Sequence, residues 1–115
     1  MAVNLNHALI AFAIAALVGL YLASHVLRAK FAPWVASLLH AAFGATGLVV
    51  LIVLFLQGSA TQSILIGFGV LVLAALGGFL LASFHLRKKI APKGIVLVHA
   101  GVAVAGFLIL LSQVL

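Results

Sequence analysis

The chain has 115 residues, of which 68% are hydrophobic and only 5% are charged. A soluble domain carries about 25% charged residues, so this composition excludes a soluble globular protein and predicts lipid as the solvent. There is no cysteine, which excludes disulfides, thiolate metal sites and covalent haem attachment through a Cys-x-x-Cys-His motif. The six Lys and Arg residues flank apolar segments and are too few to indicate nucleic-acid binding.

Four apolar segments are long enough to cross a bilayer, which takes roughly 20 residues. They run from about 6 to 29, 33 to 56, 61 to 86 and 92 to 113. Pro33 and Pro92 suit the first turn of a helix, where a missing N–H costs no hydrogen bond. The polar, uncharged run 57–62 predicts a loop between the second and third segments. The sequence therefore predicts an all-α integral membrane protein, a four-helix up-down-up-down transmembrane bundle forming one domain over 1–115.

Every Lys and Arg lies within 28–33 or 87–93, in the loops that connect the first segment to the second and the third to the fourth. The N-terminus, the middle loop and the C-terminus carry none. The positive-inside rule then places both basic loops in the cytoplasm and both termini outside. We expect an integral protein of the bacterial inner membrane, with the lipid bilayer as its first partner. Any larger activity would need other membrane subunits or a second copy of the chain in a homodimer.

The two halves of the chain align at a constant offset of 59 residues. The string Arg-x-Lys-x-Ala-Pro-x6-His occurs twice, from Arg28 to His40 and from Arg87 to His99. This predicts a duplicated helical hairpin, with repeats over about 6–56 and 61–113. Because both hairpins have the same orientation, the pseudo-two-fold axis runs along the membrane normal, as in parallel repeats.

Four of the five histidines are predicted to lie in one layer, one on each helix. His25 and His85 each lie about 6 to 7 Å from a lysine of the following basic loop. His40 and His99 each follow a proline by seven residues, or about 10 Å. A single histidine at this depth is usually an interfacial anchor or a helix–helix hydrogen bond, but ionisable residues inside membranes indicate function. His7 lies toward the opposite membrane surface, with no histidine to pair with.

Glycines accompany the histidines at helical spacings of four or seven residues. They are Gly44 and Gly47 after His40, Gly78 before His85, and Gly106 after His99. Small residues of this kind either pack helices closely or make room for a flat macrocycle beside the backbone. The spacing alone favours neither interpretation.

Two arginines, Arg28 and Arg87, lie about one turn from the histidine layer. No carboxylate side chain of the chain competes for them. Arginine binds carboxylates bidentately. If the histidines ligate the iron of a haem, we expect both arginine side chains to neutralise its propionates. The same cations would enforce membrane topology without any cofactor.

The four-span layout with His25, His40, His85 and His99 resembles the small four-helix transmembrane b-type cytochromes, in which paired histidines ligate haem iron. The resemblance implies one or two molecules of haem b and electron transfer within or alongside a respiratory or photosynthetic chain. It favours an electron-transfer protein or subunit over a stand-alone enzyme, with quinone as a candidate partner. Those proteins often stack two haems across the membrane, whereas these histidines share one layer. We therefore expect His40 and His99 as the axial pair, and His25 and His85 as neighbouring groups or ligands of a second haem.

Other classes of function stay open. Imidazoles also suit chlorophyll magnesium or a transition metal such as copper or zinc. A non-catalytic accessory subunit of a larger membrane complex fits the size of the chain. The small multidrug transporters have similar size and span number, but they depend on a membrane-embedded glutamate, and this chain has none. Histidine-driven proton coupling would have to replace it.

Overall fold

The computed structural model describes residues 3–115 as four helices without any strand in that range. They are α1 (Leu5–Leu27), α2 (Trp34–Leu56), α3 (Gln62–Leu86) and α4 (Lys93–Leu111). All four are long and apolar enough to cross a membrane. The longest dimension, 43 Å, is similar to the 40–45 Å thickness of a bilayer with its headgroups. The prediction of an all-α integral membrane protein with four spans is confirmed.

Local side-chain chemistry explains where the helices begin. Asn4 caps α1, because its side-chain oxygen accepts the N–H of Asn6 at 2.9 Å. The N–H of Asn4 in turn donates to Nδ1 of His7 at 3.1 Å, which completes a capping box. His7 therefore stabilises the start of α1. Pro33 and Pro92 stand immediately before α2 and α4 as their cap residues, one position earlier than the first turn that the sequence predicted.

The ends of α1 and α3 have the same backbone conformation. Ala29 and Lys88, which are 59 positions apart, both have left-handed conformations, with φ of 56° and 58°. The N–H groups of the next residues, Lys30 and Lys89, donate to the carbonyls five positions earlier at 2.8 and 2.9 Å. This is the Schellman pattern of helix termination, in which glycine usually takes the left-handed position. Two non-glycine residues in this conformation at equivalent sites support a duplicated hairpin.

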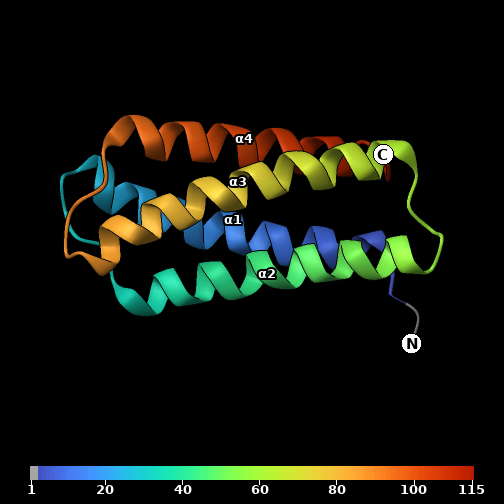
Figure 1. The fold of residues 1–115 in the computed structure, drawn as a ribbon, viewed down its shortest axis with the longest axis horizontal. Helices are drawn as coiled ribbons and strands as arrows, with labels where there is room; N and C mark the ends of the chain where they lie inside the picture. Colours follow the sequence, from blue (N-terminus) through green and yellow to red (C-terminus); the bar gives the residue numbers. More distant parts are fainter. Residues whose placement is uncertain (1–2) are drawn as a thin grey trace.

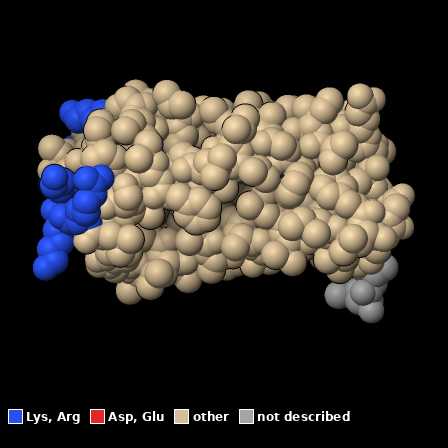
Figure 2. Space-filling view, viewed as in Figure 1, with Lys and Arg blue, Asp and Glu red and all other residues tan. Residues whose placement is uncertain are grey.

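Figure 1 shows successive helices running in opposite directions, so the two basic loops lie at one end of the molecule. The middle loop and the C-terminus lie at the other end. Every Lys and Arg belongs to the segments 28–30 and 87–93, and Figure 2 shows blue side chains gathered at the first of these ends, here called the basic end. α1 packs mainly against α2, and α3 mainly against α4, while the two hairpins meet through α1 with α4 and α2 with α3. Each hairpin is therefore the main packing unit.

The core is uneven along the bundle. The large buried side chains gather in the half remote from the basic end, in a cluster of Ala8, Leu9, Phe12, Leu51, Leu54, Ile64, Leu71 and Leu110. Toward the basic end the buried residues are smaller: Ala32, Ala36 and Val96. In Figure 1, α2 and α4 also lie further apart in projection at the basic end. The fully buried side chains in the half of the bundle that carries most histidines are therefore small.

Gly47 and Gly106 serve helix packing within each hairpin. A Cβ atom at Gly47 would lie 2.5 Å from the ring of Phe12, and one at Gly106 would lie 2.7 Å from Cγ of Leu71. The sequence suggested room for a flat cofactor at these two glycines, but neighbouring side chains fill the space. Gly44 differs from these two glycines, because a Cβ atom there would meet nothing within 4 Å.

Candidate functional site

His40 of α2 and His99 of α4 meet in the interior of the bundle. Their ring centroids are 6.0 Å apart and their planes are inclined by 78°. α2 and α4 do not pack against each other, so the two imidazoles span the diagonal between helices of different hairpins. Because the two positions are equivalent in the repeat, the pair lies about the pseudo-two-fold axis. Of the four predicted ligands, these are the two that the structure brings together.

Each imidazole of the pair is held in the same way by the other helix of its hairpin. Nδ1–H of His40 donates to the carbonyl of Ala15 at 2.8 Å, and Nδ1–H of His99 donates to the carbonyl of Ala74 at 2.7 Å. A carbonyl oxygen only accepts, so Nδ1 carries the proton and Nε2 carries the lone pair. Within residues 3–115, neither Nε2 has a hydrogen-bond partner. Histidines that bind metals through Nε2 commonly have this arrangement.

Two equivalent glycines admit these rings. A Cβ atom at Gly19 would lie 2.9 Å from Cε1 of His40, and one at Gly78 would lie 3.2 Å from Cε1 of His99. The sequence paired Gly78 with His85 on the same helix face, but His99 of α4 is the side chain beside it. Gly19 was not predicted as a site residue. The 59-residue offset that relates Gly19 to Gly78 could have identified it.

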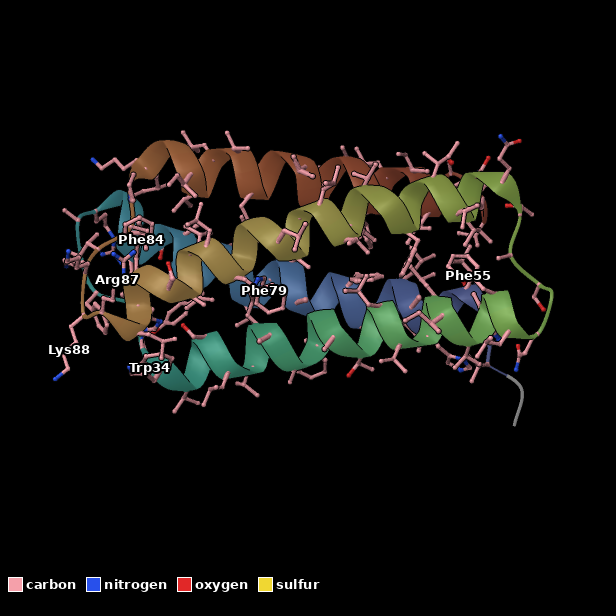
Figure 3. The ribbon with its side chains drawn as sticks, in the orientation of Figure 1. Trp34, Phe55, Phe79, Phe84, Arg87 and Lys88 are labelled. Atoms are coloured by element: carbon pink, nitrogen blue, oxygen red, sulfur yellow. The ribbon has the colours of Figure 1, made fainter. Side chains whose placement is uncertain are left out.

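His85 has a different environment, at the basic end. Its Nε2–H donates to the carbonyl of Ala32 at 3.0 Å, and its Nδ1 accepts from the hydroxyl of Ser37 at 2.9 Å. The ring stacks on Trp34 at 3.8 Å and 8°, and meets the edge of Phe31 at 4.4 Å. Because both ring nitrogens are used, His85 does not fit the predicted role of an iron ligand in this conformation. It instead joins the end of α3 to the start of α2, where Figure 3 shows Trp34.

His25 lies partly exposed on α1, away from the central pair. Its Nδ1–H donates to the carbonyl of Tyr21 at 2.9 Å, one turn earlier, and the two rings meet edge to face at 4.7 Å. The repeat equivalent of His25 is Phe84, whereas the histidine of α3 is one residue later. A slip of one residue rotates a helical side chain by about 100°, which accounts for the different surroundings of His25 and His85.

The described residues 3–115 contain no group of three or more His, Cys, Asp or Glu side chains that could hold a metal ion. The histidine layer predicted from the sequence therefore does not form one four-ligand centre. The pair of His40 and His99 supplies two nitrogen ligands. Such a pair suits a metal that brings its other ligands with it.

Arg28 and Arg87 fold back along their own helices in equivalent ways. Nε–H of Arg28 donates to the carbonyl of Ser24 at 2.9 Å, and Nε–H of Arg87 donates to the carbonyl of Ser83 at 3.1 Å. The guanidinium of Arg87 also lies over the ring of Phe84, 4.8 Å from its centroid, as Figure 3 shows. The two positive charges are therefore held at the basic end, where the chain has no carboxylate side chain to pair with them.

Comparisons with family models, with curated proteins and with solved structures find no match to this chain.

Proposed function

We propose that this chain is a membrane b-type haem protein that transfers electrons, with His40 and His99 as the two axial ligands of one haem. One observation carries the proposal. Two repeat-related imidazoles lie 6.0 Å apart, and each donates Nδ1–H to a backbone carbonyl, which leaves Nε2 with its lone pair. Such a backbone acceptor fixes the orientation of a ligating ring and raises its basicity.

The donor set favours haem over a bare metal ion. Zinc sites use four protein ligands when structural and three when catalytic, whereas this pair supplies two. A haem iron already has four nitrogen ligands from its macrocycle and needs only axial ones from the protein.

The surroundings of the pair are small and apolar. Gly19 and Gly78 make room for the two imidazoles, and the buried residues toward the basic end are Ala32, Ala36 and Val96. A bis-histidine haem iron has no open coordination position and supplies electron transfer rather than oxygen binding. The protein residues would orient and hold this group in an apolar environment.

We further propose that Arg28 and Arg87 neutralise the haem propionates, because arginine forms bidentate pairs with carboxylates. The same charges would place the loops 28–33 and 87–93 in the cytoplasm and both termini outside, in a bacterial inner membrane. Electrons would arrive from, or leave to, another membrane subunit, a second copy of the chain or a quinone.

Absorption spectra of the purified full chain, oxidised and reduced, test this proposal together with elemental analysis of protein prepared without added metal. The expected result is a Soret band, a sharp α-band on reduction and an iron content near one atom per chain. A chlorophyll spectrum would indicate a pigment site instead of a haem site. Copper or zinc without a Soret band would indicate a metal site. Protein without chromophore or metal would refute the proposal and favour an accessory subunit.

A further inference from the structure

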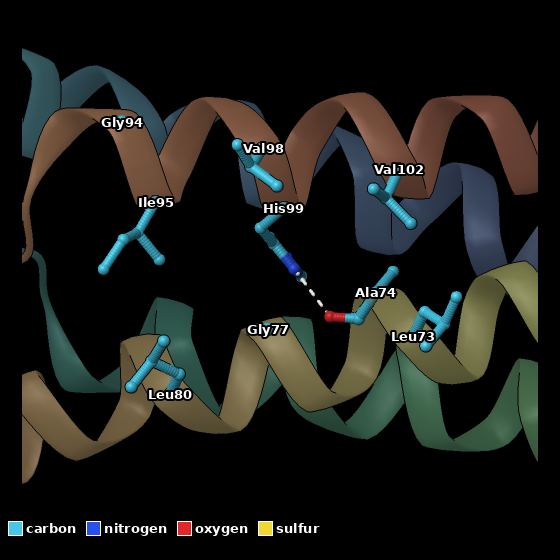
Figure 4. Close-up of a pocket in the computed structure, with 9 residues that line it drawn as sticks. All are labelled: Leu73, Ala74, Gly77, Leu80, Gly94, Ile95, Val98, His99 and Val102. Atoms are coloured by element: carbon cyan, nitrogen blue, oxygen red, sulfur yellow. Dashed lines mark hydrogen bonds between the residues drawn. The ribbon is translucent and has the colours of Figure 1, made fainter.

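A groove runs between α3 and α4 on the outer side of the second hairpin, with the first hairpin behind it (Figure 4). It has a volume of about 280 Å³. Its wall includes Leu80, Gly94 and Ile95 toward the basic end, His99 midway, and Leu73 and Val102 at the inner end. The Nδ1–H of His99 is donated to a backbone carbonyl, so the ring offers the groove no free donor. The groove therefore matches a hydrocarbon chain better than a polar molecule.

The first hairpin has an equivalent groove between α1 and α2, with a volume of about 440 Å³. Val18 and Val35 line it where the second hairpin has Gly77 and Gly94, and the lining does not include His40. The groove of the second hairpin, which has glycines at these two positions, therefore reaches its imidazole, whereas the groove of the first hairpin does not. This difference makes the first hairpin a matched comparison for the second.

The charge at the mouths of the two grooves differs as well. The loop of the second hairpin carries three lysines, Lys88, Lys89 and Lys93, while the loop of the first carries one, Lys30. Lys93 directly precedes Gly94 of the groove wall. These lysines lie at the basic end (Figure 2), where Figure 3 shows Lys88 extending away from the bundle. They are therefore placed at the level of lipid headgroups and have no carboxylate side chain to neutralise them.

We propose that the groove between α3 and α4 binds an acyl chain of an anionic phospholipid, whose headgroup phosphate is bound by Lys93 with support from Lys88 and Lys89. The apolar wall recognises the chain, and the three cations recognise the net negative headgroup. A zwitterionic lipid would bring its own cationic group toward the lysines and would bind less well. Lipid binding at this site does not depend on haem. It does not involve Arg87, which is proposed to pair with a haem propionate.

The test uses the full chain in detergent, with lipid retention followed by native mass spectrometry and stability followed by thermal unfolding. The probes are phosphatidylglycerol, phosphatidylcholine with the same acyl chains, and glycerol phosphate, which has the headgroup without chains. We expect phosphatidylglycerol alone to be retained and to raise the unfolding temperature. Equal retention of phosphatidylcholine would overturn the proposal, and so would an equal effect of glycerol phosphate, which would indicate simple anion binding.

Matched variants locate the site. Lys93→Gln should weaken retention about fivefold, because a basic residue at an anionic surface contributes about 1 kcal/mol, whereas Lys30→Gln should have little effect. Gly94→Val introduces valine, the residue found at the equivalent position of the first groove, Val35. This variant should reduce lipid retention. Gly101→Val is its control, since Gly101 lies on the same helix outside the groove with nothing within 4 Å of its Cβ position. Equal losses in each variant and its control would refute the assignment.

Discussion

His40 and His99 make the same contact with their hairpin partners: each donates Nδ1–H to a carbonyl 25 residues earlier in the chain, at 2.8 and 2.7 Å. The packing of one hairpin positions one imidazole, and the equivalent packing of the other hairpin positions the second. Because the two hairpins are related by an axis through the bundle, their equivalent imidazoles meet near it. The symmetric placement of the two imidazoles therefore follows the repeat in the sequence.

Gly19→Ala should disturb the site without touching a ligand. The added Cβ atom would lie 2.9 Å from Cε1 of His40, so the ring must move, at a cost of about 1–3 kcal/mol as for overpacked cores. We expect lower haem occupancy or a shifted spectrum. Gly44→Ala is the control, because nothing lies within 4 Å of its Cβ position. If haem titration gave the same affinity for both variants, the contact between Gly19 and His40 would have no role in the site.

Ser37→Ala should weaken the junction between the hairpins and leave the central pair intact. It removes the hydroxyl that donates to Nδ1 of His85, at a cost of about 0.5–1.5 kcal/mol of stability. Thr46→Ala is a suitable control, because Thr46 donates only to a carbonyl of its own helix, that of Ala42. Reversible unfolding in mixed detergent measures the difference. Loss of haem from Ser37→Ala with unchanged stability would instead place His85 in the cofactor site.

Gly47→Ala should destabilise the first hairpin, because the new Cβ atom would lie 2.5 Å from the ring of Phe12. Overpacking of this kind costs about 1–3 kcal/mol. Adding Phe12→Leu should restore part of that stability, because leucine is the residue at the equivalent position of the second hairpin, Leu71. Any haem bound by the double variant should keep the wild-type spectrum. A stability unchanged in Gly47→Ala would show that the close approach of α1 and α2 at this level is not important.

Much of the architecture was predictable from the sequence, because hydrophobic length, two prolines and a polar loop define four spans. The offset of 59 residues also singled out His40 and His99 as the symmetric pair, and the structure brings these two together. What the spacing could not determine was which neighbour each side chain meets. Gly78 faces His99 on another helix, and this depends on how the helices pack rather than on the periodicity of α3.

The histidine layer shows the same limit. Depth along a helix follows from 1.5 Å per residue, but the direction of a side chain around the bundle depends on helix rotation. The one-residue slip between His25 and His85 indicated that their directions differ. The hydrogen bonds of His85 to Ala32 and Ser37 required the α1–α2 loop to reach the end of α3, which no sequence pattern indicated.

Membrane orientation can be measured with single cysteines, because the chain has none of its own. Ser59→Cys places a thiol in the exposed middle loop, and Lys89→Cys places one in the exposed basic loop. If the positive-inside rule holds, a membrane-impermeant maleimide should label the first in intact spheroplasts and the second only after the membrane is opened. The opposite labelling pattern would reverse the proposed topology.

The most direct test of the central claim is the haem content of His40→Ala and His99→Ala, measured by absorbance and iron content against wild type. We expect both variants to lose the same low-spin haem, since each removes one of its two axial ligands. His25→Ala and His85→Ala should keep the low-spin spectrum and serve as matched controls. A full complement of low-spin haem in either His40→Ala or His99→Ala would contradict the assignment of this pair.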